Sequence, residues 1–439
     1  MRIAVALTAG TLALLASASA QEAPPTNSTP VPAIVPAAQS PSASARITLD
    51  DALRLALQHN HALLALRSTI LQSQAVETTA NLRPNPTLAW DAQFLPIFQP
   101  DQFNNDYLNN NAQFDIGASY LFERGKKRQH RLAAAQDATT VVRSQVSDSE
   151  RQLQFNVAQQ FINVLFAEST LDFARQDLAS FQKTVDISEA RRRAGDMSEG
   201  DLLKIKLQLL QFQTDVSTAQ LARIQALTGL RQFLGFESVP GDYDVTGDLD
   251  YQPQNTTLTD LKVLASRSRP DLLAAQESVT AARSQEALAR ANGKQDLTAG
   301  LSYSHTAGVS SATVSFSIPL AVFDRNQGEI ARTGYAITQA QQQFSETTQQ
   351  VSTDVVDAYE NLRTSDQIIQ LYRGGYVDQA KKSRDISEYA YRRGAASLLD
   401  FLDAERTYRA NQLAYRQSLA NYMLALEQLR QAVGTRNLP

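Results

Sequence analysis

The sequence lacks cysteine, and its 439 residues include only three methionines and four histidines. The absence of cysteine excludes disulfides, thiolate zinc sites and cysteine nucleophiles. One methionine is the initiator, so the thioether clusters that bind copper are missing. His59 and His61 are the only histidines close in sequence, but side chains at i and i+2 diverge on a helix and no further ligand follows at a suitable spacing. We therefore expect no metal site and no cofactor.

Glycine, proline and long apolar runs are also scarce. The 18 glycines and 15 prolines are few for this length, which favours long helices. Beyond the N-terminus, no segment approaches the roughly 20 apolar residues of a membrane-spanning helix. The sequence has no Walker motif, no glycine-rich dinucleotide loop and no G-x-S-x-G element. A formal net charge of -4 gives no basic surface for nucleic acid. These absences predict that the chain is not an enzyme and does not bind nucleic acid.

The N-terminus has the features of a secretory signal peptide. Arg2 precedes an apolar run at 3–16, and Ala18-Ser19-Ala20 forms an A-x-A cleavage site. Residues 21–46 then contain six prolines among alanine, serine, threonine and glutamine, a composition that cannot build a core. We predict a signal peptide at 1–20, a proline-rich flexible tether at 21–46 and ordered structure from there on.

The rest of the chain is an internal duplication. Asp186-Ile187-Ser188-Glu189 recurs as Asp385-Ile386-Ser387-Glu388, and the same offset of 199 residues keeps matching for about fifty residues. Earlier blocks match at an offset of about 209, which places loops of unequal length between the blocks. We predict two structural repeats, 47–250 and 251–439. Each repeat is predicted to contain a helix, two strands and a long helical hairpin.

The helical hairpins show coiled-coil periodicity. Between 126 and 194 there is neither glycine nor proline, and apolar residues from Leu153 to Val185 are spaced by threes and fours. At about 1.5 Å per residue this segment would extend about 100 Å. A second apolar line, which includes Ile162 and Phe173, lies beside the first, as expected for a stave in a closed barrel of helices. A soluble helical bundle would show the same pattern.

Four segments alternate between apolar and polar residues, at about 86–96, 112–122, 296–306 and 311–321. Their length is typical of strands that span an outer membrane, although an ordinary half-buried sheet gives the same alternation. A sheet in lipid cannot leave an open edge, and the smallest membrane barrels have about eight strands. Four strands would therefore need other copies, giving eight in a dimer or twelve in a trimer. The side chains expected to face lipid are Leu88, Trp90, Phe94, Phe114, Ile116, Tyr120, Leu301, Tyr303, Val314 and Phe316.

Several segments resemble the TolC family of outer-membrane efflux proteins over about residues 47 to 436. They are Phe316-Ser-Ile-Pro-Leu320, Phe323-Asp-Arg-Asn-Gln-Gly-Glu-Ile330 and Arg392-Arg-Gly-Ala-Ala-Ser-Leu-Leu-Asp400, combined with the signal peptide and the duplicated unit. The resemblance implies a mostly α fold with a small β-barrel portion. In that family three subunits share one twelve-stranded outer-membrane β-barrel, which continues into a long periplasmic α-helical barrel.

The resemblance also implies partners. They are two further copies in a homotrimer, outer-membrane lipid, a periplasmic adaptor and an inner-membrane pump. Phe323-Asp-Arg-Asn-Gln-Gly328 and Phe122-Glu-Arg-Gly-Lys-Lys-Arg128 resemble strand-to-helix junctions of the branch that serves resistance-nodulation-division pumps, particularly its cation-efflux members. Many relatives carry a lipidated cysteine after the signal peptide, and this chain has none.

Two turns of the duplicated hairpins have matching residues. In each turn a glycine can take the positive φ that ends a helix, a serine can cap the next helix, and an aspartate follows three residues later. The resemblance implies that these turns are the periplasmic tips that contact the adaptor, and they are also good helix-hairpin turns in their own right. The residues are Gly195, Ser198, Asp201, Gly394, Ser397 and Asp400.

The resemblance therefore predicts an outer-membrane exit duct with a long periplasmic portion. It would conduct solutes passively, heavy-metal cations or drugs among them, from an adaptor and pump to the exterior. Two alternatives remain open: a type I protein-secretion duct built on the same fold, and a periplasmic coiled-coil structural protein. Membrane fractionation would distinguish an outer-membrane duct from a periplasmic structural protein. The identity of the neighbouring pump genes would distinguish an efflux duct from a type I secretion duct.

Overall fold

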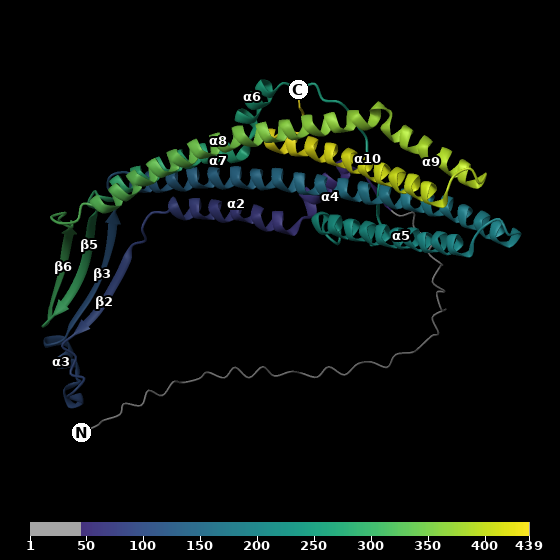
Figure 1. Cartoon of the computed structure of the whole chain (residues 1–439). Coiled ribbons are helices and arrows are strands. Elements are labelled where there is room, and N and C mark those ends of the chain that lie inside the picture. Colours follow the sequence, from purple (N-terminus) through teal and green to yellow (C-terminus); the bar gives the residue numbers. More distant parts are fainter. Residues whose placement is uncertain (1–44, 439) are drawn as a thin grey trace, which may run out of the picture. The chain divides into compact units, whose positions relative to one another are not determined.

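The computed structural model describes residues 45–438, and these form one unit. The predicted signal peptide, and the predicted tether apart from its last two residues, lie outside the described residues. A sheet lies at one end of this unit and long helices run away from it (Figure 1). Among residues 45–438, no helix is both long and apolar enough to cross a membrane.

Both repeats contain two helices, two strands of the sheet and a long helical hairpin in the same order, and the first repeat has additional short elements. The first has β1 (Arg46–Ile47), α1 (Leu49–His59), α2 (His61–Ala80), β2 (Thr87–Gln93), a short 3-10 turn (Pro100–Gln102), α3 (Asn105–Asn110), β3 (Gln113–Phe122), α4 (Lys127–Ala194), α5 (Glu199–Leu234) and β4 (Asp244–Val245). The second has α6 (Leu258–Ser268), α7 (Pro270–Asn292), β5 (Leu297–Thr306), β6 (Val309–Ser317), α8 (Gln327–Leu371), a π-helical turn η2 (Tyr372–Tyr376), α9 (Val377–Arg392) and α10 (Leu398–Val433).

Each repeat has one more helix before its strands than the sequence predicted. The helix breaks at Asn60 between α1 and α2, and at Arg269 between α6 and α7. Both residues have extended backbone angles, and the helix that follows starts anew from them. Asn60 caps α2 because its side-chain oxygen accepts a hydrogen bond from the Leu63 amide at 3.0 Å. At Arg269, Pro270 supplies the first helical position of α7, where its missing amide hydrogen costs nothing.

The same long-range contact fixes both breaks, although different residues make it. Asn60 Nδ2 donates to the Phe233 carbonyl at 3.0 Å, and Arg269 Nη1 donates to the Ala432 carbonyl at 3.1 Å. Phe233 and Ala432 are equivalent at the offset of 199 residues. Each break is therefore held against the end of its own hairpin's last helix.

A glycine follows each of these contacts and is required there. Gly235 and Gly434 have φ values of 88° and 85°. A Cβ on Gly235 would lie 2.9 Å from the His59 carbonyl oxygen, and one on Gly434 would lie 3.0 Å from the Ser268 carbonyl oxygen. Only glycine fits both the backbone angle and the close approach.

Helix α4 is the central helix of the fold. It runs for 68 residues and packs against α2, α5, α7 and α10. Both predicted apolar lines are used, because Val157 and Phe161 are buried in one core cluster and Ile162 and Phe173 are also buried. Burial on more than one side explains why α4 has no single apolar stripe.

The sheet is antiparallel, with strand order β2-β3-β5-β6 (Figure 1). β3 from the first repeat pairs with β5 from the second, so the sheet joins the two repeats. β2 is shorter than the expected 86–96, because Phe94 has a φ of 58° and ends the strand. β6 ends at Ser317, two residues before Pro319, which has no amide hydrogen to donate to a ladder.

Candidate functional site

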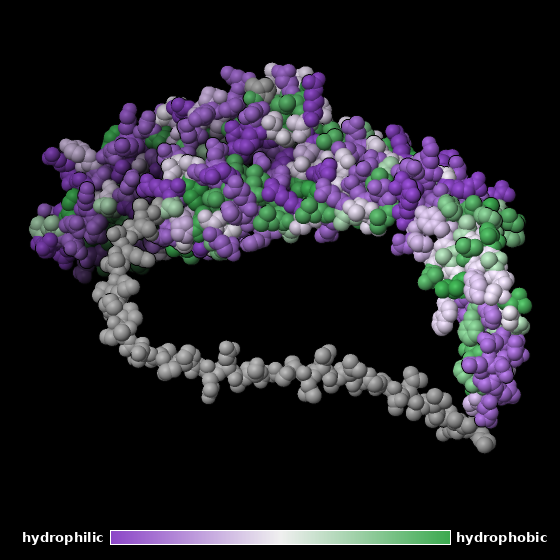
Figure 2. Space-filling view, turned by 180° about the vertical axis from the view of Figure 1, so that it is seen from behind, coloured by the Kyte–Doolittle hydropathy of each residue, from purple (hydrophilic) through white to green (hydrophobic). Residues whose placement is uncertain are grey.

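The sheet has one apolar face and one polar face, and the register shows how the side chains line up. Leu88, Ala118, Leu301 and Val314 stand in one row across the four strands. The next row contains Trp90, Ile116, Tyr303 and Ala312. Cross-strand neighbours of this kind share one face of a sheet. Figure 2 shows hydrophobic side chains gathered over this end of the molecule.

The apolar face carries large side chains that the described chain leaves uncovered. Leu88 is 76% exposed and Trp90 is 72% exposed, and Ile116, Leu301, Tyr303, Val314 and Phe316 are exposed as well. Phe114 and Tyr120 are half-buried, and the Tyr120 ring packs edge-on against Phe122 at 4.9 Å. Phe94 is exposed but lies just beyond the end of β2. That these residues face lipid stays a prediction.

The opposite face is lined by small and polar residues. Asp91, Asp115, Ser304 and Ser311 form one row, and Gly117, Ser302 and Thr313 belong to the next. A Cβ on Gly117 would lie 2.9 Å from Ser302 Cβ. Any larger residue at this position would therefore push β3 and β5 apart. Such a face suits contact with water.

Exposed aromatic residues flank the sheet at both ends, and they are not among the predicted lipid-facing residues. Phe98 is 92% exposed and follows β2, whereas Phe323 is 91% exposed and follows β6. Phe103 and Leu320 lie in the same two connections and are exposed too. The sequence pattern that could have predicted them is an aromatic residue close to a proline, just outside a strand. Aromatic girdles at this position are typical of strands that cross an outer membrane.

The two hairpin turns have the predicted local geometry. Gly195 and Gly394 have φ values of 87° and 75°. The Ser198 hydroxyl accepts a hydrogen bond from the Asp201 amide at 3.1 Å, and the Ser397 hydroxyl accepts one from the Asp400 amide at 3.2 Å. The Ser198 hydroxyl in turn donates a hydrogen bond to Asp201 Oδ2 at 2.8 Å, and this bond lowers the pKa of the Asp201 carboxyl. An ionised carboxylate there is favoured by the positive end of the helix dipole.

The fold brings the two turns together at one end of the long helices. Arg191, at the end of α4, donates a hydrogen bond to the Tyr391 carbonyl at 3.1 Å, and its guanidinium lies 5.5 Å from the Tyr391 ring centre. A groove between the turns is lined by Met197, Ser198, Tyr391, Ser397, Leu398 and Leu402, among other residues. Four of the six predicted tip residues, Ser198, Asp201, Gly394 and Ser397, line this groove, and the contact of all six with an adaptor stays a prediction.

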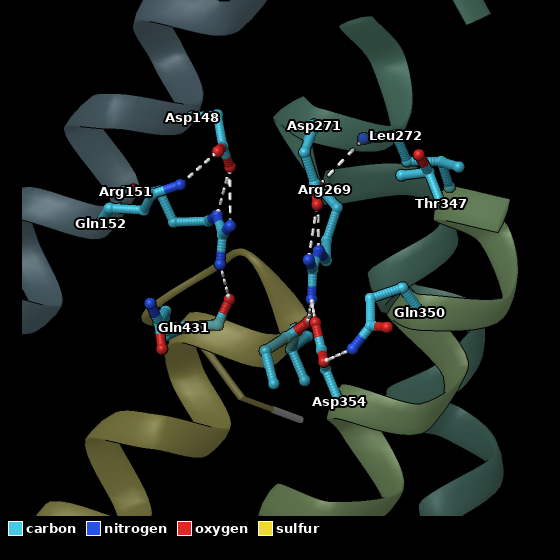
Figure 3. Close-up of polar contacts among 12 residues, drawn as sticks. Asp148, Arg151, Gln152, Arg269, Asp271, Leu272, Thr347, Gln350, Asp354 and Gln431 are labelled. Carbon is cyan, nitrogen blue, oxygen red and sulfur yellow. Dashed lines mark hydrogen bonds and ion pairs between the residues drawn. The ribbon is translucent and has the colours of Figure 1, made fainter. Parts of the chain in front are cut away.

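Arg269, a buried arginine at the break between α6 and α7, is hydrogen-bonded to residues of α7, α8 and α10 (Figure 3). Arg269 Nε and Nη2 lie 2.9 and 2.5 Å from the two carboxylate oxygens of Asp271, and Nη1 lies 2.8 Å from Asp354 Oδ2 on α8. Burial opposes ionisation of Asp271, but the hydrogen bonds and charge of Arg269 outweigh it and lower its pKa below the usual 3.8. The stabilisation from this pair is therefore present at neutral pH and is lost only as the pH falls through that lowered pKa.

The histidine pair predicted to be unrelated to metal lies at the break between α1 and α2. His61 Nε2 is 3.4 Å from Glu237 Oε2 at an exposed position. Within residues 45–438, no group of three or more histidine, cysteine, aspartate or glutamate side chains is placed to hold a metal ion.

Comparison with known proteins gives consistent matches to both repeats. A curated relative, the cobalt-zinc-cadmium resistance protein CzcC of Cupriavidus metallidurans, is 22% identical over 378 residues, which cover 85% of this chain and 86% of the relative. The outer membrane protein TolC of Vibrio cholerae is 24% identical over 316 residues, or 66% and 70% of the two chains. The crystal structure of a membrane protein from Pseudomonas aeruginosa shares the fold, with a TM-score of 0.73, 19% identity and coverage of 90% and 95%.

The family comparison covers most of each repeat and confirms the resemblance predicted from the sequence. The model for "Outer membrane efflux protein" matches residues 52–236 and 261–435. These ranges contain all four strands of the sheet and both hairpin turns. The chain therefore belongs to the outer membrane efflux protein family.

Proposed function

We propose that the chain is the outer-membrane exit duct of a tripartite efflux pump. The observation that carries this proposal is the four-stranded sheet, which has an uncovered apolar face and unpaired edges at β2 and β6 within the described chain. Such edges must be paired in lipid, where backbone groups find no water. Three copies, joined edge to edge, would form a closed twelve-stranded barrel of a size common in outer membranes.

The helices give the duct its periplasmic part. α4 and the α8–α9 segment run from the sheet to the paired turns, and α5 and α10 return from these turns for 36 residues each (Figure 1). In this arrangement the tips Gly195 to Asp201 and Gly394 to Asp400 meet the periplasmic adaptor, which in turn joins an inner-membrane pump. The family match favours this function over a periplasmic coiled-coil structural protein. The relative CzcC is named a cobalt-zinc-cadmium resistance protein, which makes heavy-metal cations the first cargo to test.

Loss of the chain is expected to raise the cellular content of the cargo. Cells without it and cells with it restored are compared for accumulation of cobalt, zinc, cadmium, a panel of drugs and a secreted protein. Restoration should lower accumulation of at least one metal or drug, and the protein should fractionate with outer membranes. A protein that stays in the periplasmic extract contradicts the proposal, whereas a defect confined to protein secretion favours the type I duct.

Valine at Gly195 or Gly394 is expected to reduce export while the trimer survives. A Cβ at either position would meet no heavy atom within 4 Å, so the only cost is the positive φ, about 1 to 2 kcal/mol. That strain would reshape the turn. The same result is expected for Ser198→Arg and Ser397→Arg, which alter the surface offered to the adaptor. Adaptor crosslinking, efflux and heat-resistant trimer are measured in parallel.

Gly200→Val is the matched control for the tip variants. Gly200 lies in the same tip with ordinary backbone angles, and a Cβ there has space. It should retain more adaptor crosslinking than Gly195→Val. Normal crosslinking and efflux in all four tip variants would contradict the proposal that these turns contact the adaptor. Loss of the trimer would show that the turns serve folding.

A further inference from the structure

A groove of about 280 Å³ lies where the sheet meets α4, and we call it the junction groove. Its aromatic lining is Tyr120 and Phe122, which belong to the apolar face at the end of β3. Its basic lining is Arg83 from the connection between α2 and β2, Lys126 just before α4 and Arg128 in the first turn of α4. Apolar and cationic side chains therefore meet in one groove.

The positive charge of the junction groove is not balanced by nearby acids. Glu123 is paired with Arg131 at 2.7 Å, and Asp296 is paired with the buried Lys127 at 2.7 Å. Within residues 45–438, no carboxylate oxygen lies within 4.0 Å of a basic nitrogen of the three bases that line the groove. Like charges this close repel one another, and an anion placed among them would relieve the repulsion.

The second repeat lacks this positive charge at its equivalent junction. Residues 123–128 contain four bases and one acid, whereas residues 324–329 contain one base and two acids. Both long helices nevertheless start in the same way, because Lys126 before α4 and Asn326 before α8 have φ values of 59° and 63°. Starting the helix therefore does not require the positive charge of the first junction.

The junction groove lies at the depth of a lipid headgroup in the proposed duct, so the inference rests on the proposed function. Ile116 stands in the middle of the apolar face, and Tyr120 is four residues further along β3. That is about 14 Å along the strand, or about 11 Å of depth at a tilt of about 40°. Half of an apolar band about 25 Å tall is about 12 Å. The long helices start on this side, which makes it the periplasmic side.

We propose that the junction groove binds the headgroup of an anionic phospholipid of the periplasmic leaflet, with the phosphate among its three bases and the acyl chains along the apolar face of the sheet. Arginine suits this role because its guanidinium can donate two parallel hydrogen bonds to one phosphate. A zwitterionic headgroup binds more weakly, because its own ammonium group lies next to the phosphate and is repelled by the bases. The bound lipid anchors the start of α4 at the membrane surface.

The single tryptophan of the sequence is the probe for this lipid. Trp90 is 72% exposed and pairs with Ile116 on the apolar face, so acyl chains on this face contact its indole. The full-length protein in a neutral detergent is titrated with phosphatidylglycerol or phosphatidylcholine, each brominated midway along its chains, and quenching of Trp90 fluorescence is recorded. Each base near an anionic lipid contributes about fivefold to its binding. Phosphatidylglycerol should therefore reach half-maximal quenching at a mole fraction lower by on the order of 10- to 100-fold.

The combined variant Arg83→Gln, Lys126→Asn and Arg128→Gln should lose this preference while phosphatidylcholine quenches as before. Lys126→Asn introduces the residue type that precedes α8 with the same sign of φ, so α4 keeps its start. Arg325→Gln is the matched control, because Arg325 is an exposed base at the second junction, and it should keep the preference of the parent. Arg83→Gln alone should lower the preference about fivefold, which tests the groove if the combined variant does not fold.

Three results would overturn the junction groove as a lipid site. They are equal quenching by the two lipids in the parent, no quenching by either lipid, and an undiminished preference in the combined variant. Inorganic phosphate should not displace phosphatidylglycerol at matched ionic strength, because it has no acyl chains; displacement would indicate a site for a free anion instead. The titration does not involve export. The expected preference in a protein that fails the export assay overturns only the proposed function, and normal export without any preference overturns only the lipid site.

Discussion

Replacement of Arg269 by methionine is expected to destabilise the chain by about 3 to 5 kcal/mol, the usual cost of removing one partner from a buried charge pair. The arginine side chain is 5% exposed, and its removal leaves Asp271 and Asp354 without their shared cation. It also removes the donor to the Ala432 carbonyl, which fixes the break between α6 and α7 against α10. The measurement is the urea midpoint of helical circular dichroism for the purified protein in detergent.

Arg267→Met is the matched control, because Arg267 is exposed and only two residues away on α6. Its midpoint should stay close to that of the parent. Arg269→Lys should give an intermediate loss, since lysine keeps the charge but cannot span both oxygens of Asp271. Equal midpoints for Arg269→Met and Arg267→Met would show that the buried cation contributes nothing to stability.

Replacement of Ile116 by arginine is expected to prevent assembly in the outer membrane. Ile116 stands between Trp90 and Tyr303 on the uncovered apolar face, in the middle of the sheet. An arginine on the lipid face near the bilayer midplane costs about 2 to 4 kcal/mol. A trimer would incur this cost in each of its three copies. The amount of heat-resistant trimer in outer-membrane fractions is the readout.

Thr313→Arg supplies the comparison, because Thr313 lies on the polar face of β6. Arginine there would face water in the proposed duct, so the trimer should persist. Val314→Arg, on the neighbouring residue but the apolar face, should repeat the loss seen for Ile116→Arg. Normal assembly of both apolar-face variants would remove these positions from the lipid surface.

Much of the architecture could be predicted because its causes are local or repeated. The absence of glycine and proline between 126 and 194 permits one long helix, and α4 spans Lys127 to Ala194. Glycine at 195 and serine at 198 carry their conformational preferences wherever they occur, so the turn geometry followed from residue type alone. Alternation with a period of two likewise separated the apolar and polar faces of the strands.

The breaks within the first helix of each repeat could not be predicted in the same way. Asn60 has no local feature that prevents a helix, and at Arg269 the only local signal is that Pro270 follows it. At both breaks the side chain donates a hydrogen bond to a carbonyl more than 160 residues away. The strand end at Phe94 is similar, since a phenylalanine with positive φ has no local preference for that conformation.

The sequence by itself therefore determined the duplication, the long helices, the two-faced strands and the turns, because each depends on the spacing and type of neighbouring residues. Only the tertiary structure decided which distant charges meet. Asp177 and Glu405 are 228 positions apart, and the repeat pattern placed a lysine, not an acid, at the equivalent of Glu405. Both carboxyls are buried because the second hairpin packs on the first, and this burial raises the pKa of Asp177 and raises that of Glu405 to about 7.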